Sequence, residues 1–198
     1  MKCKNCQYPK LKKIIDIGKQ PISSVFLSKK NNKMPNFLLD LFLCEKCNLV
    51  QFSSLAPLDD MYGTTYGYRT SLSKLMIRHI EDKYKKISNK SFLKNNSNIL
   101  DIGSNDGTFL NFFNRNKLNL NLFGIDPSAK KFQAFYNKKI NLIVDFFSKS
   151  SIDKFFKEKK IKNQKFSLIS SFAMFYDIED PNSFCKDINN LLNKDGMW

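Results

Sequence analysis

Four cysteines form two pairs with metal-ligand spacing. Cys3 and Cys6 make one CxxC pair, Cys44 and Cys47 make another, and the 37 residues from 7 to 43 separate the pairs. Two such pairs supply four thiolates, the tetrahedral set that Zn²⁺ prefers, and leave no position for water or substrate. A redox pair, structural disulfides and inert thiols are the alternatives, but a redox CxxC normally opens a helix after a strand, whereas Cys3 lies almost at the start. We therefore predict a structural zinc site.

A second group of informative residues lies in LDIGSNDGT, residues 100–108, between an apolar run and an expected helix. Gly103 permits a tight turn, and Gly107 permits close packing of the helix beside a ligand. The dinucleotide fingerprint G-x-G-x-x-G is not met, because Asn105 replaces its middle glycine, and no Walker A pattern occurs. Asp101 precedes the loop, where an acid disfavours a pyrophosphate but suits the amino group of a methionine moiety. The pattern favours S-adenosylmethionine (SAM) over NAD or ATP.

Acidic residues also end the next two expected strands. Asp126 lies in GIDPS, before Pro127 and twenty-three residues after the first loop glycine, where an acid can bind ribose hydroxyls. Asp145 and Phe146 end the third strand, where an acid can accept from the adenine amino group and an aromatic ring can stack on adenine. The alternative is that these are ordinary loop residues of a sheet that binds nothing. We predict that they complete a SAM site with the loop residues Asp101, Gly103, Ser104, Asn105 and Gly107.

Alternating strands and helices must position these loops. Short apolar runs predict strands, and apolar residues at helical spacing predict helices. We expect strands at 98–103, 120–126, 140–145 and 166–172, and helices at about 107–116, 128–137, 151–159 and 181–193. This order implies βαβ units and a parallel sheet. The predicted class is α/β, with a Rossmann-like sheet that ends near its fifth strand.

The N-terminal part has a different pattern. Strands are expected at 14–18 and 37–44, on either side of a loop at 28–36. A helix is expected from about 70, because Leu72, Leu75, Met76, Ile80 and Tyr84 lie near helical spacing, with Lys and Glu opposite. We therefore divide the chain into a zinc-ribbon-like module at 1–60, a helical linker at 61–96 that lines the pocket, and an incomplete SAM-binding domain at 97–198.

The amino-acid composition limits the kinds of partner that we expect for this protein. The net charge of +15 would suit a nucleic acid, but the lysines are scattered along the chain, and the abundance of Lys, Asn, Ile and Phe fits AT-rich codons. We favour solvated lysines over a functional basic face, and expect no nucleic-acid partner. No apolar run reaches the roughly 18 residues of a membrane span, and the polar start is no secretory signal. We expect a cytoplasmic protein without a membrane partner.

The combined motifs resemble one family, the three-domain sugar C-methyltransferases that act on nucleotide-linked deoxyketosugars. The resemblance covers essentially the whole chain and rests on the CxxC pairs and on GKQP at 18–21, CxxCxLVQ at 44–51, YGYRTSLSKLMIRH at 66–79, LDIGSNDGTFL at 100–110, GIDPS at 124–128, DFF at 145–147 and DGMW at 195–198. It implies a class I methyltransferase fold, SAM contacts from Gly103, Ser104, Asn105 and Asp126, and a zinc module that helps to form the sugar-nucleotide pocket.

The resemblance also implies a reaction. A base removes a proton next to a ketone, and the resulting carbanion or enolate attacks the SAM methyl group. Tyr66, Tyr68 and Arg69 become candidates on the substrate side, or else a packed aromatic linker. His79, the one histidine, is a pocket residue or a packed or capping one, and the base stays unassigned.

The chain departs from the family in two places. The segment after the fourth strand, 170–181, lacks the histidine that the family often has there, so the substrate is open. The family extends further, so we expect this chain to be an N-terminal fragment that lacks the family's proposed catalytic Glu-His pair.

Two other functions stay open. One is a zinc-ribbon RNA methyltransferase, although the Asp- or Asn-Pro-Pro-aromatic turn of amine-methylating enzymes is absent after the fourth strand. The other is a non-catalytic module that binds zinc and SAM.

Overall fold

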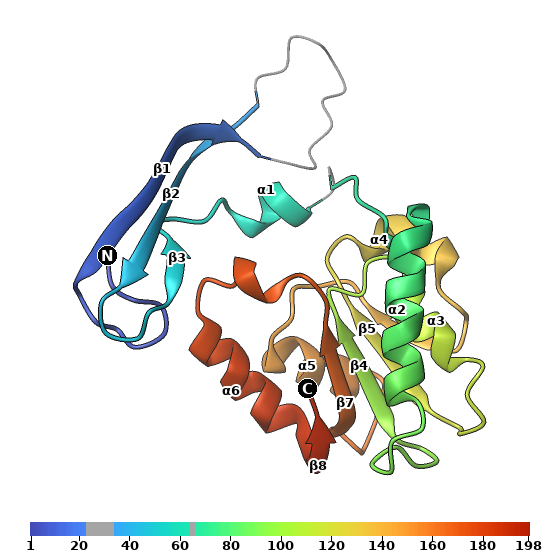
Figure 1. Cartoon of the computed structure of the whole chain (residues 1–198). Helices are drawn as coiled ribbons and strands as arrows, with labels where there is room; N and C mark the ends of the chain where they lie inside the picture. Colours follow the sequence, from blue (N-terminus) through green and yellow to red (C-terminus); the bar gives the residue numbers. More distant parts are fainter. Residues whose placement is uncertain (23–33, 64–65) are drawn as a thin grey trace. The chain divides into compact units, whose positions relative to one another are not determined.

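The computed structural model describes residues 1–22, 34–63 and 66–198 (Figure 1). They form two compact units. The first comprises the described residues of 1–68 together with 176–184, and the second comprises 69–175 together with 185–198.

The first unit is built on an antiparallel sheet of three strands in the order β1-β2-β3. Its elements are β1 (Leu11–Pro21), β2 (Asn36–Cys44), β3 (Val50–Phe52) and a short helix α1 (Leu58–Tyr62). The two expected strands are therefore present, and the first is longer than the sequence indicated. Most of the expected loop at 28–36 lies outside the described residues.

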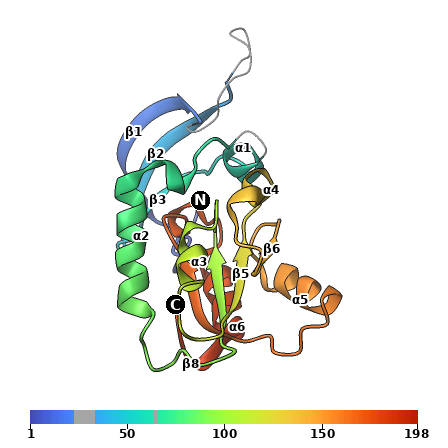
Figure 2. The ribbon, with the colours of Figure 1, turned by 90° about the vertical axis from the view of Figure 1, so that its right-hand side faces the viewer.

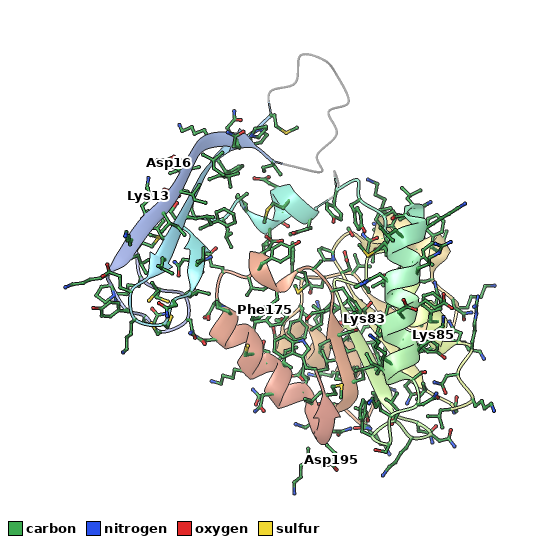
Figure 3. All side chains as sticks on the ribbon, in the orientation of Figure 1. Lys13, Asp16, Lys83, Lys85, Phe175 and Asp195 are labelled. Atoms are coloured by element: carbon green, nitrogen blue, oxygen red, sulfur yellow. The ribbon has the colours of Figure 1, made fainter. Side chains whose placement is uncertain are left out.

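Charged side chains form hydrogen bonds and ion pairs within and between the strands of this sheet. On β1, Lys13 Nζ donates to Asp16 Oδ2 at 2.9 Å (Figure 3) and also lies 3.3 Å from Asp40 Oδ2 on β2. Asp40 is 3 % exposed and accepts a hydrogen bond from the Ser53 hydroxyl. These contacts hold the pKa values of both carboxyls below their usual range: the Lys13 ammonium is the main cause at Asp16, and the Ser53 hydrogen bond is the main cause at Asp40.

The second unit contains a parallel sheet of five strands in the order β6-β5-β4-β7-β8. Its strands are β4 (Asn98–Ile102), β5 (Asn121–Ile125), β6 (Ile140–Ile143), β7 (Phe166–Ser171) and β8 (Leu192–Met197). The helices along this part of the chain are α2 (Lys74–Ile87), α3 (Thr108–Phe113), α4 (Ala129–Phe132), α5 (Lys149–Glu158) and α6 (Pro181–Leu191), with short 3-10 turns η1 (Thr70–Leu72), η2 (Gln133–Phe135) and η3 (Phe175–Asp177). The predicted α/β class with a parallel sheet is confirmed.

Apolar side chains cover both faces of this sheet. Ile99 and Leu122 on one face belong to a buried cluster with Phe109 of α3 and Ile80 of α2. Phe123 lies 5.1 Å, between ring centroids, from Phe156 of α5. Figure 2 shows α2 and α5 on opposite sides of the strands. None of the helices in the described part of the chain is long and apolar enough to cross a membrane.

Two expectations about helices need correction. The helix expected from about 70 starts later in the structure, and Leu72 and Leu75 are 69 % and 77 % exposed. The reason is that α2 begins only at Lys74, where the Ser73 hydroxyl caps it, and its buried stripe runs through Ile80. The expected helix at 181–193 ends at Leu191, and the next residue starts β8.

Candidate functional site

The four clustered cysteines of the first unit match the geometry of a zinc site. Their Sγ atoms all lie within 4.8 Å of one another, with 3.5 Å between Cys3 and Cys47 and 3.7 Å between Cys6 and Cys44. A tetrahedral site with Zn–S bonds of about 2.3 Å requires Sγ–Sγ distances of about 3.8 Å. Four sulfur ligands at these distances fit Zn²⁺ and leave no open position.

The two cysteine turns share one backbone pattern. The N–H groups of Gln7 and Asn48 donate to the carbonyls of Cys3 and Cys44, both at 3.0 Å. Both residues have left-handed φ values, 61° and 60°. This conformation, which few residues other than glycine adopt, turns each chain back so that both cysteines of a pair face the same point. Sequence reasoning missed these two residues, although each directly follows a CxxC pair.

Gln51 joins one cysteine turn to the sheet. Its Oε1 accepts from the Lys4 N–H at 2.8 Å, and its Nε2 donates to the Lys2 carbonyl at 3.2 Å. The side chain is 7 % exposed, so both groups need these partners. Gln51 therefore anchors the first CxxC turn to β3.

In the second unit, the glycine loop of residues 103–107 connects β4 to α3. Most of its backbone N–H groups donate within the protein. Those of Gly103 and Ser104 donate to the Ile125 carbonyl, at 2.9 and 3.4 Å, and that of Gly107 donates to the Ser104 carbonyl at 2.8 Å. A phosphate-binding loop aims such groups at its ligand. This loop instead uses them to fold against the end of β5.

Asp126 and Asn105 hold the loop at the end of β5. Asp126 Oδ2 accepts from the Asn105 N–H at 2.8 Å, and its Oδ1 accepts from the Ser128 N–H at 2.7 Å. Asn105 has a left-handed φ of 51°, which explains why asparagine can replace a glycine here. Its carbonyl accepts from the Tyr136 hydroxyl at 2.8 Å, and its Oδ1 accepts from the Thr70 N–H at 2.9 Å. Asn105 thus connects the loop to three other segments.

Tyr136 packs directly on the loop. Its hydroxyl also lies 2.8 Å from Ser104 Oγ, and a Cβ added at Gly107 would come within 2.7 Å of its ring. Gly107 is therefore required by the close approach of this ring and by its φ of 75°. The sequence indicated the glycine but gave no signal for Tyr136.

Asp106 connects the loop to the segment before α2. Its side chain is 1 % exposed, and its Oδ2 accepts from the Ser71 N–H at 2.8 Å. Its Oδ1 accepts from the Thr108 hydroxyl at 2.6 Å at the start of α3. Sequence reasoning did not select Asp106, although it lies inside the loop motif.

Asp101 lies at the end of β4, where it is 3 % exposed. Its Oδ1 accepts from the Ser170 hydroxyl of β7 at 2.6 Å. Burial raises the pKa of Asp101 to about 7, and the nearby charge of Asp126 adds to this rise, while the Ser170 hydrogen bond opposes it. A carboxyl that changes its protonation near neutral pH therefore lies beside the loop.

The residues expected to bind adenine follow β6. Asp145 is exposed and accepts from the Phe146 N–H at 2.8 Å, while Phe146 is half-buried. Pro127, after Asp126, is also half-buried. Because β4, β5 and β6 are parallel neighbours, their carboxyl ends bring the three sets of expected residues to one edge of the sheet.

Two family models match the chain. Residues 72–197, more than half of the chain, match a model described as a methyltransferase domain. The chain belongs to this methyltransferase family. Residues 3–62 match a model described as a proposed zinc binding domain, and they contain the four clustered cysteines. The two domain types agree with the cofactors expected from the sequence: SAM with the methyltransferase domain and zinc with the zinc-binding domain.

Two solved structures that are similar to the chain are described as methyltransferases or their complexes. One is the complex of the Haloferax volcanii Trm112 methyltransferase activator with a proposed methyltransferase, at 17% identity over 62% of this chain and 54% of that chain, with a TM-score of 0.43. Another is the plantazolicin methyltransferase BpumL with a triazolic substrate analogue and S-adenosylhomocysteine (SAH), at 19% identity over 62% and 45%, with a TM-score of 0.46. The chain spans about half the length of these structures. No curated protein matches the chain.

The tyrosine segment of this methyltransferase chain forms an aromatic cluster in the first unit. The ring centroid of Tyr66 lies 5.2 Å from that of Tyr62 and 6.3 Å from that of Tyr68. The Tyr62 hydroxyl donates to Asp177 Oδ2, in the segment that follows β7. Burial raises the pKa of Asp177, and the Tyr62 hydrogen bond opposes the rise. Sequence reasoning missed Tyr62 and Asp177, and the other candidate, His79, is exposed on α2.

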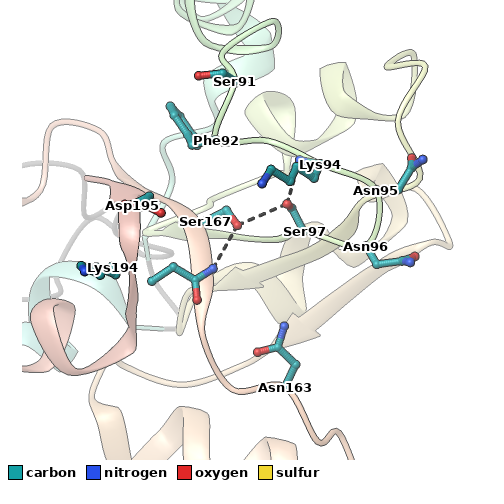
Figure 4. A pocket seen from close by; sticks show the side chains of 12 residues that line it. Ser91, Phe92, Lys94, Asn95, Asn96, Ser97, Asn163, Ser167, Lys194 and Asp195 are labelled. Carbon is teal, nitrogen blue, oxygen red and sulfur yellow. Dashed lines mark hydrogen bonds between the residues drawn. The ribbon is translucent and has the colours of Figure 1, made fainter.

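A cavity of about 750 Å³ lies at the other edge of the methyltransferase sheet, where β4, β7 and β8 begin. Ser167 Oγ donates to Ser97 Oγ at 3.2 Å, and Asn193 Nδ2 donates to Ser167 Oγ at 3.1 Å, which forms a polar chain along its wall (Figure 4). The cavity lies at the amino ends of the strands, whereas the glycine loop follows a carboxyl end. It is therefore separate from the expected cofactor site.

Proposed function

We propose that this chain is the SAM-binding part of a methyltransferase, with the cofactor at the carboxyl edge of the five-stranded sheet. The observation that carries this proposal is the link between the glycine loop after β4 and Asp126 after β5, with Asp145 and Phe146 after β6. Adjacent parallel strands that end in these residues form the crevice in which α/β sheets bind nucleosides.

The chemistry of the loop fits SAM better than a nucleotide phosphate. Most of its N–H groups donate within the protein, so they cannot neutralise a phosphate. Three buried acidic side chains surround it instead: Asp101, Asp106 and Asp126. Carboxyl groups attract a cation and repel a phosphate. SAM, when bound, supplies a methyl group on a positively charged sulfur.

Each residue has a proposed role in binding. Asp126 Oδ2 accepts from the Asn105 N–H, and a carboxylate oxygen has a second lone pair that can accept from one ribose hydroxyl. Asp101 would face the cofactor's ammonium group, which favours its charged form. Phe146 would stack on adenine, and Asp145 would accept from the adenine amino group. The zinc module would have a structural role, because four sulfur ligands saturate the metal.

For the substrate, we propose carbon methylation of a nucleotide-linked ketosugar. The support is the sequence resemblance, together with the aromatic cluster of Tyr62, Tyr66 and Tyr68, since sugar rings pack well on aromatic faces. An acid–base group is needed to remove the proton next to the ketone. Asp177 is an acidic group that accepts from Tyr62 of that cluster, and its pKa lies above the usual range.

Titration of the purified protein with SAM and SAH by calorimetry tests the cofactor proposal. We expect micromolar binding of both and about one zinc per chain by elemental analysis. Phe146→Ala should weaken binding about tenfold, whereas Phe155→Ala, which removes a similarly half-buried ring from α5, should leave it unchanged. Absence of SAM and SAH binding by the folded, zinc-loaded protein would contradict the proposal.

Methyl transfer from labelled SAM tests the substrate proposal. A panel of nucleotide-linked ketosugars and a panel of RNAs would be compared under the same conditions. Label in the sugar fraction supports the proposal. Label in RNA would overturn it and would give the positive charge of the chain a function.

A further inference from the structure

The segment before α2 is fixed to the glycine loop by its backbone. The Thr70 N–H donates to Asn105 Oδ1 at 2.9 Å, and the Ser71 N–H donates to Asp106 Oδ2 at 2.8 Å. Both acceptors are nearly fully buried loop residues. The residue just before these two, Arg69, is therefore held beside the loop by hydrogen bonds that involve none of its own side chain.

The Arg69 side chain packs on an aromatic ring, and no carboxylate in the described part of the chain forms an ion pair with it. Its guanidinium carbon lies over the Phe135 ring, 4.2 Å from the ring centroid, a cation–π contact that restrains the group. Its Nε is buried and has no hydrogen-bond partner among the residues that the structure describes. Among the described residues, the ion pairs are made by Lys13, Lys85 and Lys149, and none includes Arg69. A buried donor without an acceptor is costly, which indicates that a ligand supplies the acceptor.

The charges around the loop indicate which ligand group this is. The amino-acid end of SAM carries an ammonium and a carboxylate. Three loop-side acids, Asp101, Asp106 and Asp126, suit the ammonium but repel the carboxylate. Arg69 is a cation held beside the same loop, and a planar guanidinium binds a carboxylate through two parallel hydrogen bonds.

We propose that Arg69 binds the carboxylate of the methionine moiety of SAM. The sequence resemblance suggested a place for Arg69 on the substrate side, whereas its contacts favour the cofactor. This inference rests on the proposed function, because it requires a SAM site at the glycine loop. Tethering by Thr70 and Ser71 and stacking on Phe135 would orient the guanidinium before the cofactor arrives, which lowers the entropy lost on binding.

The test compares two ligands that differ by one group. Decarboxylated SAM keeps the ammonium and the sulfonium but lacks the carboxylate. Calorimetry with SAM and with decarboxylated SAM would be done on the wild-type chain, on Arg69→Met and on Arg78→Met, which removes an exposed arginine from α2. We expect Arg69→Met to weaken SAM roughly 10- to 100-fold and to change decarboxylated SAM less than twofold. Arg78→Met should change neither.

Each other outcome has a defined meaning. Equal weakening of both ligands by Arg69→Met would show that Arg69 only supports the loop, and unchanged SAM binding would show that it does not contact the cofactor; either overturns the inference. A wild-type chain that binds neither ligand would overturn the proposed function itself. Arg69→Lys keeps the charge but loses the planar guanidinium. Its affinity for SAM should lie between those of the wild type and Arg69→Met, and its affinity for decarboxylated SAM should not change.

Discussion

The backbone N–H of Asn105 donates to the carboxylate of Asp126 across 2.8 Å. This bond joins the loop after one strand to the end of the next strand. It gives Asp126 a second task besides the proposed contact with the ribose, because the same carboxylate fixes the loop that would surround the cofactor.

Asp126→Asn should therefore lower both stability and cofactor affinity. The amide keeps the size of the carboxyl but loses one acceptor oxygen, which weakens the bonds from Asn105 or Ser128. We expect a loss of about 1–3 kcal/mol in the free energy of unfolding, together with weaker SAH binding. Asp145→Asn, at an exposed position, should lower SAH affinity alone. Thermal unfolding and calorimetry check this, and an unchanged unfolding temperature for Asp126→Asn would count against the double role.

Gly107→Ala should destabilise the second unit more than its backbone conformation alone explains. Gly107 and Gly18 have almost equal left-handed φ values, 75° and 74°. Alanine costs about 1 kcal/mol at either position for that reason. At Gly107 the new Cβ also meets the Tyr136 ring at 2.7 Å, whereas nothing lies within 4 Å at Gly18. We expect roughly 1–3 kcal/mol more from this overlap.

Denaturant unfolding of the two variants, followed for each unit, measures the difference. Gly107→Ala together with Tyr136→Ala should recover part of the loss, since the second change removes the ring. Equal destabilisation by Gly107→Ala and Gly18→Ala would show that the ring moves aside without cost.

The Asp101 carboxyl should make the stability of the second unit depend on pH. Because burial raises its pKa from 3.8 to about 7, the folded state holds a proton that the unfolded chain releases. The contribution of the protonated Asp101 to the free energy of unfolding is complete below about pH 4 and is lost as the pH rises toward 7. The total change is on the order of 4 kcal/mol. Asp101→Asn, which resembles the protonated acid, should flatten this dependence. Unfolding of both proteins between pH 4 and 8 tests it, and parallel pH profiles would contradict the role of Asp101.

The same carboxyl should release a proton when SAM binds. A cofactor ammonium beside Asp101 would favour the charged form and lower its pKa. Calorimetry at pH 6.5 in two buffers of different ionisation enthalpy should then give a different apparent binding enthalpy for each. Asp101→Asn should remove that difference, and a wild-type enthalpy independent of the buffer would exclude contact between the two groups.

Gln51→Leu should loosen the zinc site without removing a ligand. The substitution deletes the hydrogen bonds to the backbone of Lys4 and Lys2, on either side of Cys3. Each of these lost hydrogen bonds costs about 0.5–1.5 kcal/mol. We expect faster zinc loss to a coloured chelator. Gln20→Leu, which removes a side chain that donates to the Ile17 carbonyl on the same strand, should release zinc at the wild-type rate. Equal rates for all three proteins would show that Gln51 does not support the cysteine turn.

Much of the chemistry could be predicted from the sequence because it depends on short spacing. The x-x interval in each CxxC pair brings two sulfurs to one metal whatever surrounds them. The parallel sheet follows from alternating apolar runs, and its parallel order places Asp101, Asp126 and Asp145 at one edge without knowledge of any contact. The sequence also indicates the importance of Gly107, but it gives no sign that the close approach of the Tyr136 ring requires a glycine there.

Tertiary structure alone decided which partners these residues have. Tyr62 and Asp177 are 115 residues apart, and no local pattern could pair them. The contact of Arg69 with Phe135 likewise depends on how the segments around η1 and η2 pack. Contacts between residues that are distant in the sequence form only when the elements that carry them pack together. Asn105 illustrates both contributions. The sequence shows that an asparagine replaces a glycine of the dinucleotide-binding pattern. Only the folded chain shows that its N–H, carbonyl and side chain bind three different partners.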